Sequence, residues 1–242
     1  MKINTNSQLV CVNSALILIF FMIISFVVIA GWMPPLSPAL NADQVAEIFR
    51  TDTNRIRLAG FVMTIGAVFL WPFGVAISEQ MKRIEGQLHH PLANLQLATV
   101  TLTVGAIFLA GMLWMLCAFR PERAPEITQI MSDLSWFFFI GAIPPAVIQV
   151  LAIGYCVLTD HRKTPVMPRW FGFCNLWIAT GFLVGEGVFF FKTGPFAWNG
   201  LAAFWMAAFF FFGWIIVTWY VVREAILHEA AEAKNLSAQG AA

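Results

Sequence analysis

Residues 13–33 read NSALILIFFMIISFVVIAGWM, a run of 21 residues without a charged side chain. An α-helix rises about 1.5 Å per residue, so about 20 apolar residues cross the hydrocarbon core of a bilayer. A secretory signal has a shorter apolar core of about 7–15 residues and then an Ala-x-Ala cleavage site, whereas this segment runs into Trp-Met-Pro-Pro. We therefore expect a retained transmembrane helix.

Five further apolar segments have a comparable length, with approximate bounds 57–79, 93–118, 135–158, 170–191 and 200–222. They lack the alternation of barrel strands, and a helix satisfies every backbone group within its own segment. The composition agrees, because only 11% of the residues are charged against about 25% in soluble domains. The sequence predicts an all-α, polytopic membrane bundle of six transmembrane helices, with residues 1–242 forming a single integral membrane domain.

The longest loop, residues 34–56, contains a helix signal of its own. Asn41 and Gln44 have the spacing of a capping box, and an apolar stripe at helical spacing follows them, formed by Val45, Ile48 and Phe49. This pattern predicts a short amphipathic helix over Ala42–Thr51, which lies on the outer surface or forms a lid over the bundle. A second short helical turn is expected after Pro125.

Loop lysines and arginines indicate the orientation. With the N-terminus inside, the inner side holds the larger set, Lys2, Lys82, Arg83, Arg162, Lys163, Arg169, Arg223 and Lys234, and the outer side holds Arg50, Arg55, Arg57, Arg120, Arg123 and Lys192. The excess predicts cytoplasmic termini in a bacterial-type inner membrane or a plasma membrane. Residues 223–242 are then a cytoplasmic tail, expected as a frayed helix.

Several tryptophans lie where the predicted helices end. Those at the outer ends are Trp32, Trp114, Trp136 and Trp198. Indole rings prefer the headgroup level of a membrane. We therefore expect these four side chains to form an interfacial belt.

Glu186, in Gly185-Glu-Gly187, is the acidic residue of the fifth predicted span. Carboxylic acids inside a membrane usually face the bundle interior or a wet cavity, and they often serve function. Burial favours the neutral acid, which can donate a proton. The alternative is that Glu186 reaches outer water or pairs with an outer arginine.

Pro144 and Pro145 fall inside the fourth predicted span. Because proline has no N–H, this pair should free the carbonyls of Ile140 and Gly141, which then need another partner in the membrane. Gln149, one turn further on, supplies polar groups beside the break. Broken helices border substrate sites in transporters, although a simple packing kink is the alternative.

The outer arginines form a possible receptor for an anion. Arg55, Arg57 and Arg120, together with Arg50 and Arg123, could bind a carboxylate or phosphate. Six acids occur in the same region, so mutual ion pairing explains the arginines as well: Asp43, Glu47, Asp52, Glu122, Glu126 and Asp133.

Several function classes have no support. No histidine falls inside a predicted span, and Cys11, Cys117, Cys156 and Cys174 form no Cys-x-x-Cys pair. We therefore expect neither a metal nor another cofactor. Neither a phosphate-binding glycine loop nor a nucleophile elbow occurs, and the net charge of +1 gives no indication of nucleic-acid binding.

Three hypotheses remain. The first is a protein that binds or passes a lipophilic, possibly anionic small molecule through an outward-opening pocket between the second, fourth and fifth spans. Its lining would be Pro144, Pro145, Gln149 and Glu186, with Arg55, Arg57 and Arg120 at the mouth. The second is an intramembrane isomerase or cyclase of an isoprenoid-like substrate with Glu186 as its general acid. The third is a non-catalytic subunit of a larger membrane complex or a homo-oligomer.

Overall fold

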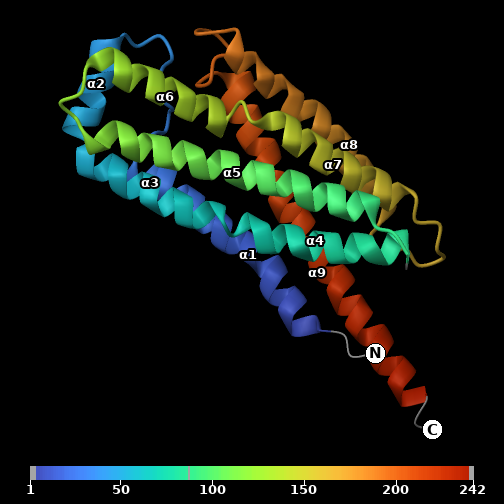
Figure 1. The fold of residues 1–242 in the computed structure, drawn as a ribbon. Coiled ribbons are helices and arrows are strands. Elements are labelled where there is room, and N and C mark those ends of the chain that lie inside the picture. The colour runs from blue at the N-terminus through green and yellow to red at the C-terminus, as the bar shows by residue number, and fades with distance from the viewer. Residues whose placement is uncertain (1–3, 87, 240–242) are drawn as a thin grey trace.

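The computed structural model describes residues 4–86 and 88–239. Within these ranges the chain is helical, without strands, and six helical stretches are long and apolar enough to cross a membrane: Thr5–Ile29, Thr53–Glu85, Pro91–Phe119, Pro125–Leu158, Arg169–Phe189 and Leu201–Ser237. These stretches pack against one another as a bundle (Figure 1). The predicted six-helix membrane bundle is therefore confirmed.

Most of the six stretches contain a change of helix type or an interruption. In the first half the elements are α1 (Thr5–Ile23), the π-helix η1 (Ile24–Ile29), α2 (Ala42–Thr51), α3 (Thr53–Ala67), α4 (Leu70–Glu85) and α5 (Pro91–Phe119). In the second half they are α6 (Pro125–Phe139), α7 (Ile143–Leu158), α8 (Arg169–Leu183), the 3-10 helix η2 (Val184–Phe189), the π-helix η3 (Leu201–Met206) and α9 (Ala207–Gln239).

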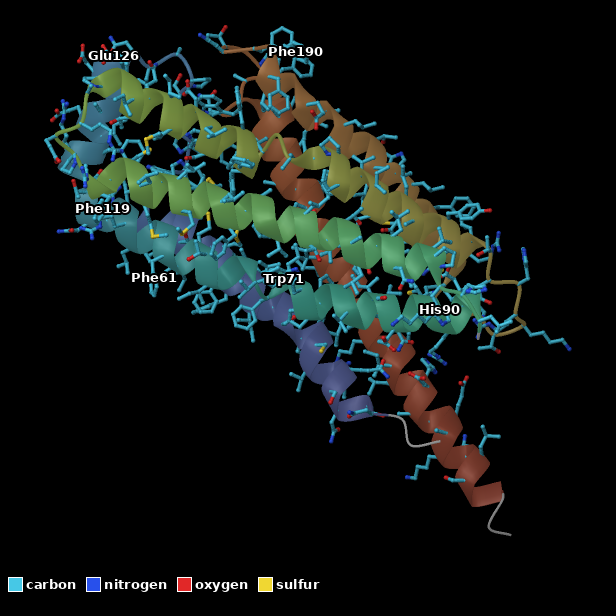
Figure 2. All side chains as sticks on the ribbon, viewed as in Figure 1. Phe61, Trp71, His90, Phe119, Glu126 and Phe190 are labelled. Carbon is cyan, nitrogen blue, oxygen red and sulfur yellow. The ribbon has the colours of Figure 1, made fainter. Side chains whose placement is uncertain are left out.

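The bundle has two different ends. The lid end carries α2 and the loop 120–124, and the terminal end carries the start of α1, the loop 159–168 and the second half of α9 (Figure 1). Glu126 and His90 mark these opposite ends in Figure 2. Between them, apolar side chains such as Phe61 and Trp71 are exposed on the outside of α3 and α4 (Figure 2). This surface is suited to contact with lipid.

The amphipathic helix α2 has the bounds predicted from the sequence. The Asn41 side chain accepts a hydrogen bond from the Gln44 backbone N–H at 2.9 Å, and the Gln44 side chain accepts one from the Asn41 N–H at 3.0 Å. This reciprocal capping box satisfies two backbone donors at the start of α2. The buried face of the helix, which includes Val45 and Phe49, lies over α6 and α3.

The fourth membrane stretch begins ten residues before its predicted start at 135, at Pro125, which opens α6 as a full helix in place of the expected short turn. Helix α6 ends at Phe139, and α7 begins at Ile143 after an interruption over 140–142. Pro144 and Pro145 therefore lie in the first turn of α7, where a missing N–H costs no intrahelical bond. The predicted proline-dependent break is present, at the junction between two helices.

Helix α9 continues well beyond residue 222, and its extension is anchored to the bundle. The Glu229 carboxylate accepts hydrogen bonds from the side-chain amides of Gln8 at 3.3 Å and Gln80 at 3.2 Å, and it pairs with Arg83 at 3.4 Å. Val222, Ala225 and Ile226 are buried on the same helix. The first part of the predicted tail is thus a packed segment that joins α1, α4 and α9.

Candidate functional site

A cavity of about 180 Å³ lies at mid-height in the bundle. Its walls come from α1 with η1, from α5, from the interruption between α6 and α7, from α8, and from η3 with α9. The lining is apolar except for Thr103, whose hydroxyl donates to the Thr99 carbonyl at 3.2 Å. The other lining residues are Met22, Ile23, Phe26, Val27, Met33, Ala106, Ile107, Phe138, Phe139, Ile140, Ala142, Ile143, Ala146, Phe182, Ala203, Phe204, Ala207, Ala208, Phe211 and Phe212.

Three irregular backbone segments meet at this cavity. The π-helices η1 and η3 supply Phe26 and Phe204, and the interruption between α6 and α7 supplies Ile140 and Ala142. In η1 the bond from Ala30 N–H to the Ser25 carbonyl spans five residues at 2.9 Å, as in a π-helix. π-Bulges are rare and occur often at functional sites. Their convergence marks the cavity as the candidate site.

The cavity opens sideways, toward the membrane. The lining side chains of Ile23, Val27 and Met33 are 45%, 39% and 41% exposed, and all three are apolar. On the other wall the partly exposed lining residues Ala207 and Phe211 belong to α9. The exposed lining residues of this rim are apolar, which suits contact with the hydrocarbon of a bilayer.

Stacked phenylalanine rings form the wall of the cavity toward the lid end. The ring of Phe26 stacks on Phe139, with centroids 5.3 Å apart and planes 15° apart, and on Phe204 at 5.8 Å. Each of these phenylalanines lies in an irregular segment or beside one, since Phe139 is the last residue of α6. The wall is therefore built on the parts of the backbone that lack regular α-helical bonding.

The tryptophans expected at the outer membrane surface lie behind this wall instead. Trp32, Trp114, Trp136 and Trp198 are at most 6% exposed, so the predicted interfacial belt is wrong for all four. Trp114 and Trp136 meet at 5.1 Å, and Trp198 stacks on Trp136 at 5.8 Å. The reason is that residues 32–49 fold back over the lid end: Phe49 of α2 packs against Trp32, and the Trp198 indole donates to the Leu36 carbonyl at 2.7 Å.

The polar candidates from the sequence flank the cavity without lining it. Gln149 is 2% exposed, its Nε2 has no hydrogen-bond partner, and it lies one turn beyond the lining residue Ala146. Glu186 lies in η2, one turn beyond the lining residue Phe182, and its buried Oε1 also has no partner.

Pro144 and Pro145 lie between two lining residues of α7. Pro144 is exposed and Pro145 half-buried, while Ile143 and Ala146 on either side of them line the cavity. The residues at positions 144 and 145 cannot donate to the carbonyls of residues 140 and 141. Their effect on the site is therefore to hold the interruption between α6 and α7 in place.

The arginine candidates lie at the lid end, apart from this cavity. Arg55 donates to the Ala30 carbonyl at 2.7 Å and pairs with Asp52 at 3.6 Å. Arg57 lies 5.7 Å from the Phe119 ring centroid, and Arg120 is exposed at the end of α5. Arg55 is connected to the cavity rim through the backbone, because Ala30 is three residues before Met33. Neither these arginines nor Glu186 belong to the lining of the cavity.

The sequence contained no signal for the apolar lining residues. Every span is rich in leucine, isoleucine and phenylalanine, so nothing in the pattern distinguishes Ile107 or Ala203 from a residue that faces lipid. The proline pair lies between two lining residues, and the phenylalanine-rich stretch 171–212 contributes Phe182, Phe204, Phe211 and Phe212 to the lining. No protein family, curated protein or solved structure matches this chain.

Proposed function

We propose that this membrane protein binds a lipophilic small molecule whose apolar chain enters the mid-membrane cavity from the bilayer. The observation that carries the proposal is an apolar cavity with an apolar rim, formed where two π-helices and a proline-dependent helix interruption meet. A regular bundle would close such a space, because packed helices leave few voids larger than a water molecule.

The size of the cavity limits what it holds. A pocket for a whole drug-sized ligand has about 300–1,000 Å³, and this cavity has about 180 Å³. It is close to the dry, engineered cavities of about 150 Å³ that accept one benzene molecule. The cavity therefore fits one end of an acyl or isoprenoid chain, while the rest of the molecule stays in the membrane.

The polar residues take supporting roles in this proposal. Gln149 and Glu186 lie beside the cavity, and each has an unpartnered polar atom. Pro144 and Pro145 keep the helix interruption in place. An anionic group on the same molecule would bind at the exposed arginines of the lid end, Arg55, Arg57 and Arg120. Arg55 has the strongest support because its hydrogen bond to Ala30 places it near the Met33 rim.

Mass spectrometry of the lipid extract from detergent-purified protein tests the proposal. Ala207→Leu fills part of the cavity that the bound chain would occupy, so we expect the amount of co-purified molecule to fall about tenfold, which corresponds to about 1.4 kcal/mol. Ala98→Leu, on an exposed face of α5, is the matched control and should retain it. A wild-type extract with no enriched molecule would contradict the proposal.

A second candidate function is catalytic and rests on Glu186. Its buried Oε1 has no partner, and the adjacent Gly185 packs against the Ile143 side chain, which lines the cavity. A neutral carboxylic acid there could protonate a double bond of an isoprenoid-like occupant as a general acid. In that case Glu186→Gln should retain a bound molecule that differs chemically from the one in the wild type, whereas identical molecules in both would exclude the catalytic role.

We also propose that the terminal end faces the cytoplasm of a bacterial-type cell. The basis is the larger set of lysines and arginines at that end, which includes Arg83, Arg162 and Lys163. A fluorescent protein fused after Ala242 should be active, and alkaline phosphatase at the same position should be inactive. The opposite pattern would reverse the orientation.

A further inference from the structure

Two buried indole N–H groups beside the cavity have no acceptor among residues 4–86 and 88–239. Trp114 is 1% exposed and Trp136 is 0% exposed, and the Nε1 atom of each lacks a hydrogen-bond partner. The N–H of a buried tryptophan usually finds a partner, as it does at Trp198 and at Trp214, which donates to Asn175 Oδ1 at 2.9 Å. A buried polar group without a partner calls for an explanation in a folded protein, and here two such indoles are adjacent.

The two indoles lie next to the cavity on its lid side. Trp136 is one helical turn before the lining residue Ile140, and Trp114 is two turns beyond the lining residue Ile107 on the same face of α5. The Phe139 ring contacts both, with centroids 5.4 Å from Trp114 and 6.1 Å from Trp136. A single phenyl ring of the cavity wall therefore borders both donors.

The wall between the cavity and the indoles lies on irregular backbone. Phe26 lies in the π-helix η1, and Phe139 is followed at once by the interruption over 140–142. Neither indole lines the cavity, so the hydrogen bonds proposed below require one of these two rings to turn aside.

We propose that Trp114 and Trp136 donate hydrogen bonds from Nε1 to a carbonyl oxygen on the lipophilic occupant, such as the oxygen of a ketone, ester or quinone. An indole N–H is a donor only, so the pair selects an acceptor. A carbonyl oxygen has two lone pairs and brings no donor of its own, and it can receive both bonds. This inference rests on the proposed function, because the chain of the same molecule fills the cavity.

Indole N–H signals in protein labelled with ¹⁵N-tryptophan, held in detergent micelles, report directly on these bonds. The probes are 2-tridecanone and tridecane, which have the same chain length and differ in one carbonyl oxygen. Trp114→Phe and Trp136→Phe each remove one signal and so assign it. We expect 2-tridecanone to move both signals downfield, and tridecane to leave them in place.

Binding affinities provide the second readout, measured by competition with a photoreactive alkyl probe. The double variant Trp114→Phe/Trp136→Phe loses both neutral hydrogen bonds, so its affinity for 2-tridecanone relative to its affinity for tridecane should fall about tenfold. Trp205→Phe, at an exposed tryptophan, is the control and should bind both probes as the wild type does.

Three results would overturn the inference. In the first, the indole N–H signals do not shift when 2-tridecanone is added, and they lie upfield. This result would place the N–H groups against ring faces, where Trp32 and Trp136 meet Trp114 edge-on at 72° and 71°. Unchanged affinity for the ketone in the double variant would exclude the hydrogen bonds while leaving the cavity proposal intact. Failure of both probes to bind would remove the proposed function and this inference with it.

Discussion

The two ends of the bundle differ in their carboxylates and in their backbone. At the terminal end the carboxylates are well partnered: Glu229 joins three helices, the Glu85 carboxylate accepts bonds from the Leu92 and Ala93 N–H groups at 2.9 Å, and Asp160 accepts three. Toward the lid end the helices are interrupted, and Glu186 keeps an unpartnered oxygen. Neutral side chains with unpartnered atoms occur in both halves, at Trp114 and Trp136 and also at His90 and Gln96.

We infer from this contrast that the paired carboxylates of the terminal end stabilise the bundle, because breaking a buried hydrogen bond costs free energy. The irregular half, which contains the cavity, is the part to which we assign binding. Substitutions in the two regions should consequently affect different measurements.

The largest loss of stability is expected for Glu229→Ala. The substitution leaves Arg83, Gln8 and Gln80 without their shared acceptor, and the Arg83 and Glu229 side chains are only 23% and 16% exposed. We expect a loss of about 2 kcal/mol in the free energy of unfolding, measured by thermal unfolding in detergent. Glu232→Ala, which removes an exposed partner of the same Arg83 at 3.5 Å (its side chain is 63% exposed), is the matched control. An equal effect of both substitutions would contradict the anchoring role of Glu229.

Asp160 gives the terminal end a pH dependence. Burial alone would raise the pKa of Asp160, but hydrogen bonds from the Val166 N–H and from the Arg162 side chain and N–H, together with the Arg162 charge, lower the pKa below its ordinary value of 3.8. A depressed pKa stabilises the fold above that ordinary value, and the contribution disappears as the pH falls through the folded-state pKa.

Asp160→Asn should therefore destabilise the protein by about 1.5 kcal/mol near neutral pH, because an amide N–H replaces an acceptor. The difference from wild type should be constant between pH 5 and pH 8 and should shrink below about pH 4. Chemical unfolding across this range measures it, with Glu122→Gln in an exposed turn as control. A difference that grows on acidification would refute the assignment.

A smaller difference in stability is expected between a buried tryptophan whose N–H has an acceptor and one whose N–H has none. Trp214→Phe breaks the bond to Asn175 and leaves a buried amide oxygen unpartnered, so it should cost about 1 kcal/mol more than the change in side-chain volume alone. Trp136→Phe removes an N–H that already lacks a partner and should cost less than Trp214→Phe. The two variants unfolded side by side in one detergent test this, and the reverse order would show that the Trp136 N–H has an acceptor.

The sequence specified the architecture far better than the site. Uncharged runs identified the six spans, and Asn41 with Gln44 set the start of α2, because a cap and a hydrophobic run are local features. A helical turn was predicted after Pro125, but its extension into the full helix α6 was not, since residues 125–134 include polar side chains such as Glu126 and Asp133 that the bundle accommodates near the lid end.

The candidate site depended on contacts that a sequence does not contain. The aromatic cluster requires Trp32, Trp114, Trp136 and Trp198 to converge from four separate segments, and the same residues are compatible with an interfacial belt. Pro144 and Pro145 marked the helix interruption, yet the cavity is lined by the apolar residues around them. Polar side chains stand out in a membrane sequence, whereas the walls of an apolar cavity do not.

Photo-crosslinking in lipid nanodiscs tests the central claim most directly. A diazirine-bearing alkyl probe should label residues 138–146 and 203–212 in a saturable manner, so that excess 2-tridecanone suppresses the labelling, and Ala207→Leu should abolish this component while Ala98→Leu preserves it. Labelling that is spread over exposed positions such as Phe61 and Trp71, with no competition and no effect of Ala207→Leu, would show that the cavity takes up no molecule from the membrane.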